Sequence, residues 1–158
     1  MNTIHVAGGV GVADTAMASY DAALADANLH NYNLVTVSSV IPASATLAAV
    51  GTAPDLGPAG ERLTVVQARA TTAGPGRVSA ALGWTTSEDG PGLFYEAADE
   101  TGREDVADRV RAGLEAGRDL REWRFTDERV ETVSIDADPG TYAAAVVVAA
   151  YGDSDPVC

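Results

Sequence analysis

The chain has 158 residues, of which 46% are hydrophobic, so we expect one domain with a substantial core over residues 1–158. Its 23 acidic residues against 10 basic ones give a formal charge of -13, which disfavours a nucleic acid or an anionic membrane as partner and favours a cationic small molecule. Such an acidic excess is typical of the proteins of salt-loving organisms.

The basic residues are all arginine, and the chain contains no lysine. A pyridoxal-phosphate enzyme holds its cofactor as a lysine Schiff base, so this chain by itself cannot be one, and imine chemistry would need another carbonyl. Cys158 is the only cysteine, and His5 and His30 lie far apart, so we expect neither a disulfide nor a metal site. With no apolar run near the ~20 residues that span a bilayer, and no signal-peptide pattern, we expect a cytoplasmic protein.

The first third of the chain predicts a strand, a helix and a second strand. Residues 3–7 favour a short strand, followed by a glycine-rich turn at 8–11 that lacks a complete nucleotide-binding pattern. Asp14 or Thr15 can cap a helix that continues to about residue 27. Residues 34–41 are mostly β-branched and predict a strand that a proline closes. The predicted apolar face of the helix consists of Ala16, Met17, Tyr20, Ala23, Leu24 and Ala27.

The rest of the chain predicts five more strands and a long helix. The strands are expected at residues 63–72, 78–86, 93–98, 128–136 and 141–151, after a loop at 52–60. Residues 143–150 are so uniformly apolar that we expect a buried central strand there. Residues 101–123 predict the helix, with Thr101 and Glu104 spaced as a capping box. Its predicted apolar stripe consists of Val106, Val110, Leu114, Gly117 and Leu120.

Two helices among about seven strands favour an α/β fold, a four-layer αββα sandwich in which a helix covers the outside of each mostly antiparallel sheet.

The strand at 34–41 ends in two adjacent hydroxyls, Ser38 and Ser39. If the Ser39 hydroxyl attacked the Ser38 carbonyl, the peptide would become an ester, and elimination would leave dehydroalanine, which hydrolyses to a pyruvoyl group. A Ser-Ser pair by itself more often ends a strand than cleaves, so both interpretations stay open at this point.

Four short motifs occur in order along the chain: Tyr20-Asp21-Ala22-Ala23-Leu24, Asn31-Tyr32-Asn33-Leu34, Val37-Ser38-Ser39-Val40-Ile41-Pro42 and Gly92-Leu93-Phe94-Tyr95-Glu96. With these motifs the chain resembles the pyruvoyl-dependent arginine decarboxylases. Their order and spacing match the family, and the similarity covers about residues 4–151. The segments before Gly8, after Pro42 and at 55–60 depart from the family pattern, which affects the loops more than the chemistry.

The resemblance implies self-cleavage between Ser38 and Ser39. It would give a small chain of residues 1–38 and a large chain of residues 39–158 that begins with a pyruvoyl group made from Ser39. The pyruvoyl ketone would condense with the amine of L-arginine to an imine, and loss of CO2 would yield agmatine for polyamine synthesis. Neither pyridoxal phosphate nor a metal would be required.

The same resemblance implies a role for each polar residue of the motifs. Glu96 would protonate the substrate after CO2 leaves if burial raises its pKa, although the sequence alone favours an outward-facing strand residue. Asp21 would bind the substrate guanidinium as a bidentate pair, unless it only complements the helix dipole. Asn33 would polarise the Ser38 carbonyl or orient the substrate, or else merely start a strand. Ser38, once freed, would contribute a carboxylate that helps to hold the cationic substrate.

The family implies homotrimers, or pairs of trimers, with sites between subunits, so that Asp21 and Ser39 would meet across an interface. Two alternative functions remain. A pyruvoyl decarboxylase for another basic amino acid would keep Ser39 and relax the role of Asp21. An unprocessed, non-catalytic trimeric binding protein would keep the fold without cleaving.

Overall fold

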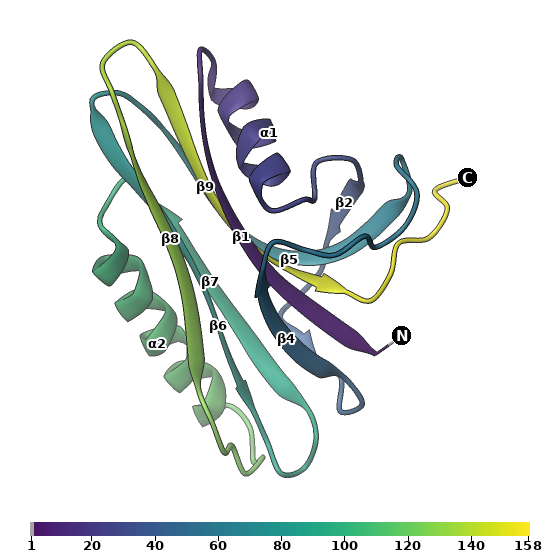
Figure 1. The fold of residues 1–158 in the computed structure, drawn as a ribbon. Coiled ribbons are helices and arrows are strands. Elements are labelled where there is room, and N and C mark those ends of the chain that lie inside the picture. The colour runs from purple at the N-terminus through teal and green to yellow at the C-terminus, as the bar shows by residue number, and fades with distance from the viewer. Residues whose placement is uncertain (1) are drawn as a thin grey trace.

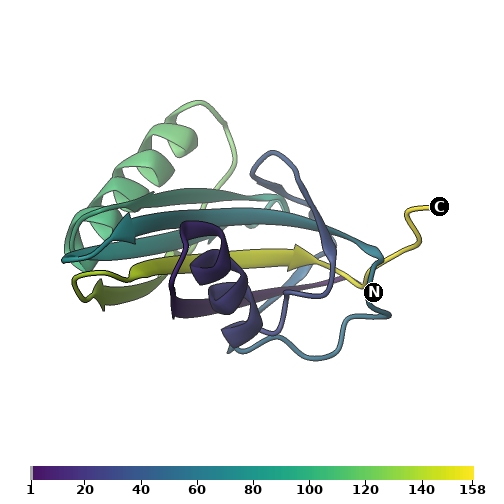
Figure 2. The same ribbon diagram turned by 90° about the horizontal axis from the view of Figure 1, so that it is seen from above.

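The computed structural model describes residues 2–158, which form nine strands and two helices in four layers (Figures 1 and 2). In chain order these are β1 (Thr3–Ala13), α1 (Ala16–Asp26), β2 (Asn33–Thr36), β3 (Val40–Ile41), β4 (Thr46–Gly51), β5 (Arg62–Ala73), β6 (Gly76–Thr86), β7 (Gly92–Asp99), α2 (Arg103–Asp119), β8 (Arg129–Ala137) and β9 (Tyr142–Tyr151). The two helices lie outside two facing sheets, which confirms the predicted αββα sandwich (Figure 1).

One sheet has five strands in the order β2-β5-β9-β1-β4, and the other has four in the order β3-β7-β6-β8. The pairs β1–β4 and β2–β5 are parallel, and the other pairs are antiparallel. β9 lies in the middle of its sheet with residues 143–150 all buried, as predicted from their apolar run. β4 was not predicted, because its small residues do not alternate clearly between apolar and polar.

The prediction for β1 was too short, since residues 8–11 continue the strand instead of turning. Their glycines serve close packing. A Cβ on Gly9 would lie 2.1 Å from the Ala23 carbonyl oxygen, and one on Gly11 would lie 2.5 Å from the Ala23 nitrogen, so only glycine lets α1 approach the strand this closely. Of the two predicted caps, Asp14 and Thr15, the helix uses Thr15, whose side chain accepts a hydrogen bond from the Ala18 N–H at 3.1 Å.

The two helices bury their central apolar residues but not the ends of the predicted faces. Ala23 and Leu24 of α1 are buried, whereas Met17 is 82% exposed. α2 ends at Asp119, so Leu120, which is 81% exposed, lies beyond the helix. The predicted capping box is wrong, because α2 begins after Gly102 without a side-chain cap. Val106, Val110 and Leu114 are buried as predicted.

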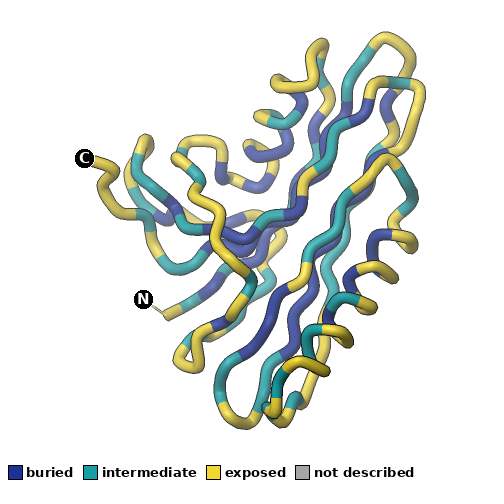
Figure 3. The backbone as a smooth tube through the Cα atoms, turned by 180° about the vertical axis from the view of Figure 1, so that it is seen from behind, coloured by how far each residue is buried: buried dark blue, intermediate teal, exposed yellow. Residues whose placement is uncertain are grey.

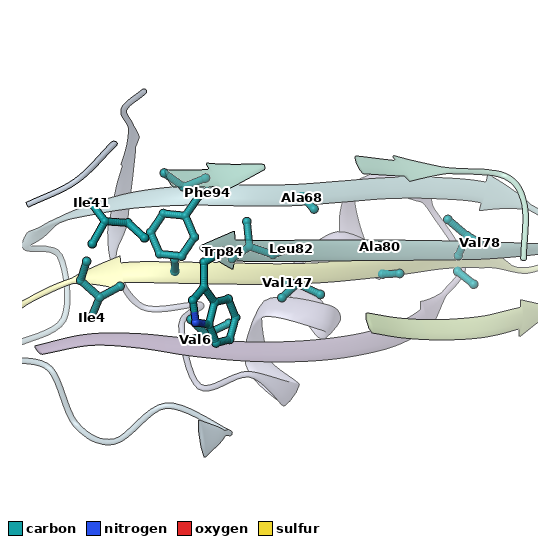
Figure 4. Packing of buried hydrophobic residues seen from close by; sticks show 14 of the residues in the cluster. Ile4, Val6, Ile41, Ala68, Val78, Ala80, Leu82, Trp84, Phe94 and Val147 are labelled. Atoms are coloured by element: carbon teal, nitrogen blue, oxygen red, sulfur yellow. The ribbon is translucent and has the colours of Figure 1, made fainter. Parts of the chain in front are cut away.

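Side chains from both sheets form an inter-sheet core, and Figure 3 shows the burial concentrated on the facing strands. Ile4 of β1, Ile41 of β3 and Phe94 of β7 lie at one end of this core (Figure 4). Trp84 packs edge-on against Phe94, with ring centroids 6.3 Å apart and an interplanar angle of 74°. This end of the core therefore joins β1 of one sheet to β3, β6 and β7 of the other.

The strand predicted at residues 34–41 is in fact two strands in different sheets. β2 pairs with β5 in the five-stranded sheet, whereas β3 pairs with β7 in the four-stranded sheet. Residues 37–39 carry the chain from one sheet to the other, and we call them the crossover. The mostly β-branched run on both sides of the two serines hid this break, because such a pattern does not show which strand each half will pair with.

Replacing Gly9 by alanine should lower the free energy of unfolding by about 3 kcal/mol or more, because the new methyl group meets the backbone of α1, which cannot move aside like a side chain. Urea unfolding at fixed high salt measures the change. Gly102→Ala is the control, since a Cβ at Gly102 meets nothing within 4 Å. Equal stability of the two variants would contradict the packing role of Gly9.

Candidate active site

The crossover is tied to both sheets on either side of Ser38. The Val37 N–H donates to the Val65 carbonyl at 2.9 Å, which extends the pairing of β2 with β5 by one residue. The Phe94 N–H donates to the Ser39 carbonyl at 2.7 Å, next to the first pair of β3 with β7. Ser38 itself is exposed. The bond between Ser38 and Ser39 therefore lies between two fixed points.

Glu96 lies beside Ser39 because of the alternation of β7. Phe94 belongs to the inter-sheet core, and Ala98 packs against it. Every second side chain of a strand points to the same face, so Glu96 lies on the face of Phe94 and Ala98. Burial raises the pKa of the Glu96 carboxyl, and the nearby Ser39 hydroxyl lowers it again in part. Its Oε2 atom is buried and finds no hydrogen-bond partner among residues 2–158. The alternative of an outward-facing strand residue is therefore wrong.

A cavity of about 470 Å³ opens at this point, between the crossover, β7 and the C-terminal half of α2. It is lined by Ser38, Ser39, Val40, Leu93, Phe94, Tyr95, Glu96, Gly113, Leu114, Ala116, Gly117, Leu120 and Arg121. The cavity is mixed: Ser38, Ser39, Tyr95, Glu96 and Arg121 are the polar residues in a lining that is otherwise apolar. Ser39 and Glu96 therefore border the same cavity.

Two residues at the site carried no signal in the sequence analysis. Arg121 lines the cavity, and its Nη1 donates to the Gly117 carbonyl at 2.9 Å. Tyr151, at the end of β9, donates from its hydroxyl to the Val40 carbonyl at 3.0 Å. Burial, together with the charge of Glu96, raises the pKa of Tyr151 to about 12. A tyrosine at the end of an apolar strand is the sequence signal for such a residue, because its ring packs on the core while its hydroxyl finds a polar partner.

The other two predicted site residues lie elsewhere in the chain. Asp21 is exposed on α1, which packs against the five-stranded sheet, and it does not line the cavity at Ser39. Asn33 begins β2, and its Nδ2 donates to the Gly60 carbonyl at 2.8 Å. Within one chain, the fold thus brings Ser38, Ser39 and Glu96 together but leaves Asp21 and Asn33 outside their cavity.

The described residues also show whether the chain could hold a metal ion, a membrane-spanning helix or a carbonyl group at residue 39. In the range 2–158, no cluster of three or more histidine, cysteine, aspartate or glutamate side chains has the arrangement of a metal site. No helix in the same range is long and apolar enough to cross a bilayer. A carbonyl group at position 39 would fit the site, because the orphaned Oε2 of Glu96 could then gain a polar neighbour beside the cavity.

The fold and the site define a class of αββα proteins with a serine pair at a sheet crossover and a half-buried carboxyl beside it. The model of the family "pyruvoyl-dependent arginine decarboxylase" matches residues 3–156. A protein of that name from Halobacterium salinarum is 64% identical over 157 residues, covering 99% of this chain and 98% of the relative.

More distant relatives carry the same name. One from Pyrococcus horikoshii is 35% identical over 141 residues, which cover 87% of this chain and 88% of the relative. One from Methanopyrus kandleri is 32% identical over 143 residues, which cover 90% of this chain and 91% of the relative. The chain belongs to the pyruvoyl-dependent arginine decarboxylase family.

Replacing Glu96 by glutamine should stabilise the protein increasingly as the pH rises above 4.5, the ordinary pKa of the group. Between this value and the raised pKa of the folded state, the folded protein binds more protons than the unfolded protein. The free energy of unfolding of the parental protein therefore falls as the pH rises, whereas that of the uncharged variant does not change for this reason. The gain should level off above the raised pKa. Unfolding at several pH values measures it, with the exposed Glu104→Gln as control for the loss of one charge. A constant difference across pH would argue against a raised pKa.

Proposed function

We propose that residues 1–158 form one cytoplasmic decarboxylase domain, which converts L-arginine to agmatine and CO2 with a pyruvoyl group made from its own Ser39. The observation that carries the proposal is the position of Ser39 at a sheet crossover, beside a cavity and a carboxyl of raised pKa, in a member of this family. The acidic surface and the Halobacterium relative fit a protein that works at high salt.

Self-cleavage begins when the Ser39 Oγ attacks the Ser38 carbonyl carbon. The peptide C–N bond breaks as the new C–O ester bond forms, and the nitrogen of residue 39 takes the hydroxyl proton. Loss of the Cα proton of residue 39 then expels the Ser38 carboxylate from Cβ and leaves an aminoacrylyl group, the dehydroalanine state of residue 39. One water molecule enters and one ammonia leaves as this group becomes a ketone.

The fold is suited to keep both pieces together after such a break. Residues 1–38 would contain β1, α1 and β2, and β1 lies between β9 and β4 inside the five-stranded sheet. β1 pairs with β9 over ten residues, from Ile4 to Ala13, and β2 pairs with β5 over four. A break in the crossover removes none of these pairs. The small chain would therefore remain a part of the sheet.

A pyruvoyl ketone supplies an electrophile for the substrate amine and a sink for the electrons that CO2 leaves behind. The chain's own residues do the rest. Leu93, Phe94 and Leu114 exclude water from the cavity, while Glu96, whose raised pKa favours the protonated form, donates the proton that replaces CO2. The freed Ser38 carboxylate adds a negative charge that attracts the cationic substrate.

Asp21 and Asn33 complete the site from a second subunit in this proposal. Asp21 is exposed and lies outside the cavity of its own chain, which leaves its carboxylate available to a guanidinium at a neighbouring subunit's Ser39. Asn33, also exposed, orients the substrate or polarises the Ser38 carbonyl at the same kind of interface. The assembly proposed is a trimer or a pair of trimers.

Intact-protein mass spectrometry tests the cleavage. The purified parental protein should give two chains, residues 1–38 and a residue 39–158 chain with a blocked N-terminus, whereas Ser39→Ala should give one uncut chain of 16.2 kDa. A parental protein that remains one chain would refute the enzyme and support the unprocessed binding protein instead.

The proposed binding of the substrate guanidinium by Asp21 can be tested by comparing substrates. Asp21→Asn should raise the KM for arginine about tenfold or more, because a charge-assisted bidentate pair is lost, and should narrow the preference for arginine over ornithine and lysine. CO2 release from the three amino acids measures both effects. Asp14→Asn removes the same charge from an exposed position just before α1 and is the control. Unchanged discrimination in Asp21→Asn would favour the decarboxylase of another basic amino acid.

A further inference from the structure

Tyr151 connects the end of the central strand β9 to the residue that follows Ser39. Its hydroxyl donates a hydrogen bond to the Val40 carbonyl at 3.0 Å. β9 belongs to the five-stranded sheet and β3 to the four-stranded sheet, so this bond bridges the two sheets where the chain has just crossed between them. The backbone of Tyr151 is fixed in turn, because it pairs with Ile4 of β1.

A second bond holds the preceding carbonyl. The Phe94 N–H donates to the Ser39 carbonyl at 2.7 Å, so the carbonyl groups of residues 39 and 40 are both held. The two donors also support each other, since the rings of Phe94 and Tyr151 meet edge to face, with centroids 6.0 Å apart at an angle of 64°. Two consecutive peptide groups on the downstream side of the Ser38–Ser39 bond are thereby fixed in orientation.

The hydroxyl is a reliable donor at this position. Burial, with the charge of Glu96 added to it, raises the pKa of Tyr151 to about 12, so the phenol keeps its proton across the ordinary pH range. Tyr151 is linked to the site by two contacts: its hydroxyl bonds the carbonyl of the residue after Ser39, and its ring packs on Phe94, two residues before Glu96 on β7.

We propose that Tyr151 is a positioning residue for the reaction at residue 39, holding the Val40 carbonyl so that the Ser39 side chain stays aligned with the Ser38 carbonyl and with Glu96. The inference deepens the proposed function and rests on it. Attack of a hydroxyl on its own preceding carbonyl needs one narrow range of backbone angles at residue 39, and a freely rotating peptide group at residue 40 would widen that range. Tyr151 touches neither the scissile carbonyl nor the substrate in this role.

The test is the rate of chain cleavage in freshly translated protein, followed on denaturing gels and by intact mass. Tyr151→Phe keeps the ring against Phe94 and removes only the hydroxyl. It should cleave about tenfold more slowly than the parental chain, the effect of losing one hydrogen bond that aligns the reacting atoms. Once cleaved, the variant should show a lower kcat for arginine with an unchanged KM, because the hydroxyl does not bind substrate.

Two controls separate positioning from general stability. Val148→Ala opens a gap in the same strand on the side of α1, where Val148 is fully buried, and should destabilise the protein at least as much without slowing cleavage. Tyr142→Phe removes a hydroxyl at the opposite end of β9 and should also cleave at the parental rate. The inference about Tyr151 would be overturned if Tyr151→Phe cleaved as fast as the parental chain, or if Val148→Ala cleaved as slowly as Tyr151→Phe. Neither result would affect the proposed function. An uncut parental chain would overturn the proposed function as well.

Discussion

The hydrogen bond from the Phe94 N–H to the Ser39 carbonyl is the contact on which the arrangement of the site depends. It begins the pairing of the crossover with β7, and this pairing takes the chain out of the five-stranded sheet and into the four-stranded one. The same strand carries Glu96 two residues further on. One register between β3 and β7 therefore sets both the position of the Ser38–Ser39 bond and that of the carboxyl beside it, since a shift by one residue would turn Glu96 to the other face.

Such a crossover can be broken without loss of the fold because the stabilising contacts lie elsewhere. β1 is an interior strand, and α1 is held against it by the close approach that Gly9 and Gly11 allow. The inter-sheet core joins strands from both sides of the crossover. A site for backbone chemistry is thus placed in a segment that the sheets hold at its two ends, while the segment itself contributes little burial.

Much of the fold followed from local patterns, and the errors have a common cause. The apolar run of β9, the strand β6 and the Thr15 cap were predicted because each depends on neighbouring residues alone. The glycines of β1 were misread as a turn, and the strand at 34–41 was read as one element. Both errors concern which element packs against which. The local pattern of apolar and polar residues reports neither the close approach of α1 to β1 nor the change of sheet at residues 37–39. The Tyr151 hydroxyl was missed for the same reason, since its acceptor lies 111 residues away in the chain.

The sequence by itself determined the chemical groups of this protein: a serine pair able to rearrange, a carboxyl two residues beyond Phe94, no lysine for a pyridoxal cofactor, and motifs of the decarboxylase family in the right order. Only the tertiary structure decided which of these groups meet. It placed Ser39 and Glu96 at one cavity, bonded Tyr151 to the residue that follows Ser39, and left Asp21 and Asn33 outside the cavity. The physical reason is that residue types follow from the chain, whereas proximity and burial, and with them the raised pKa of Glu96, arise only when strands far apart in sequence pair and pack.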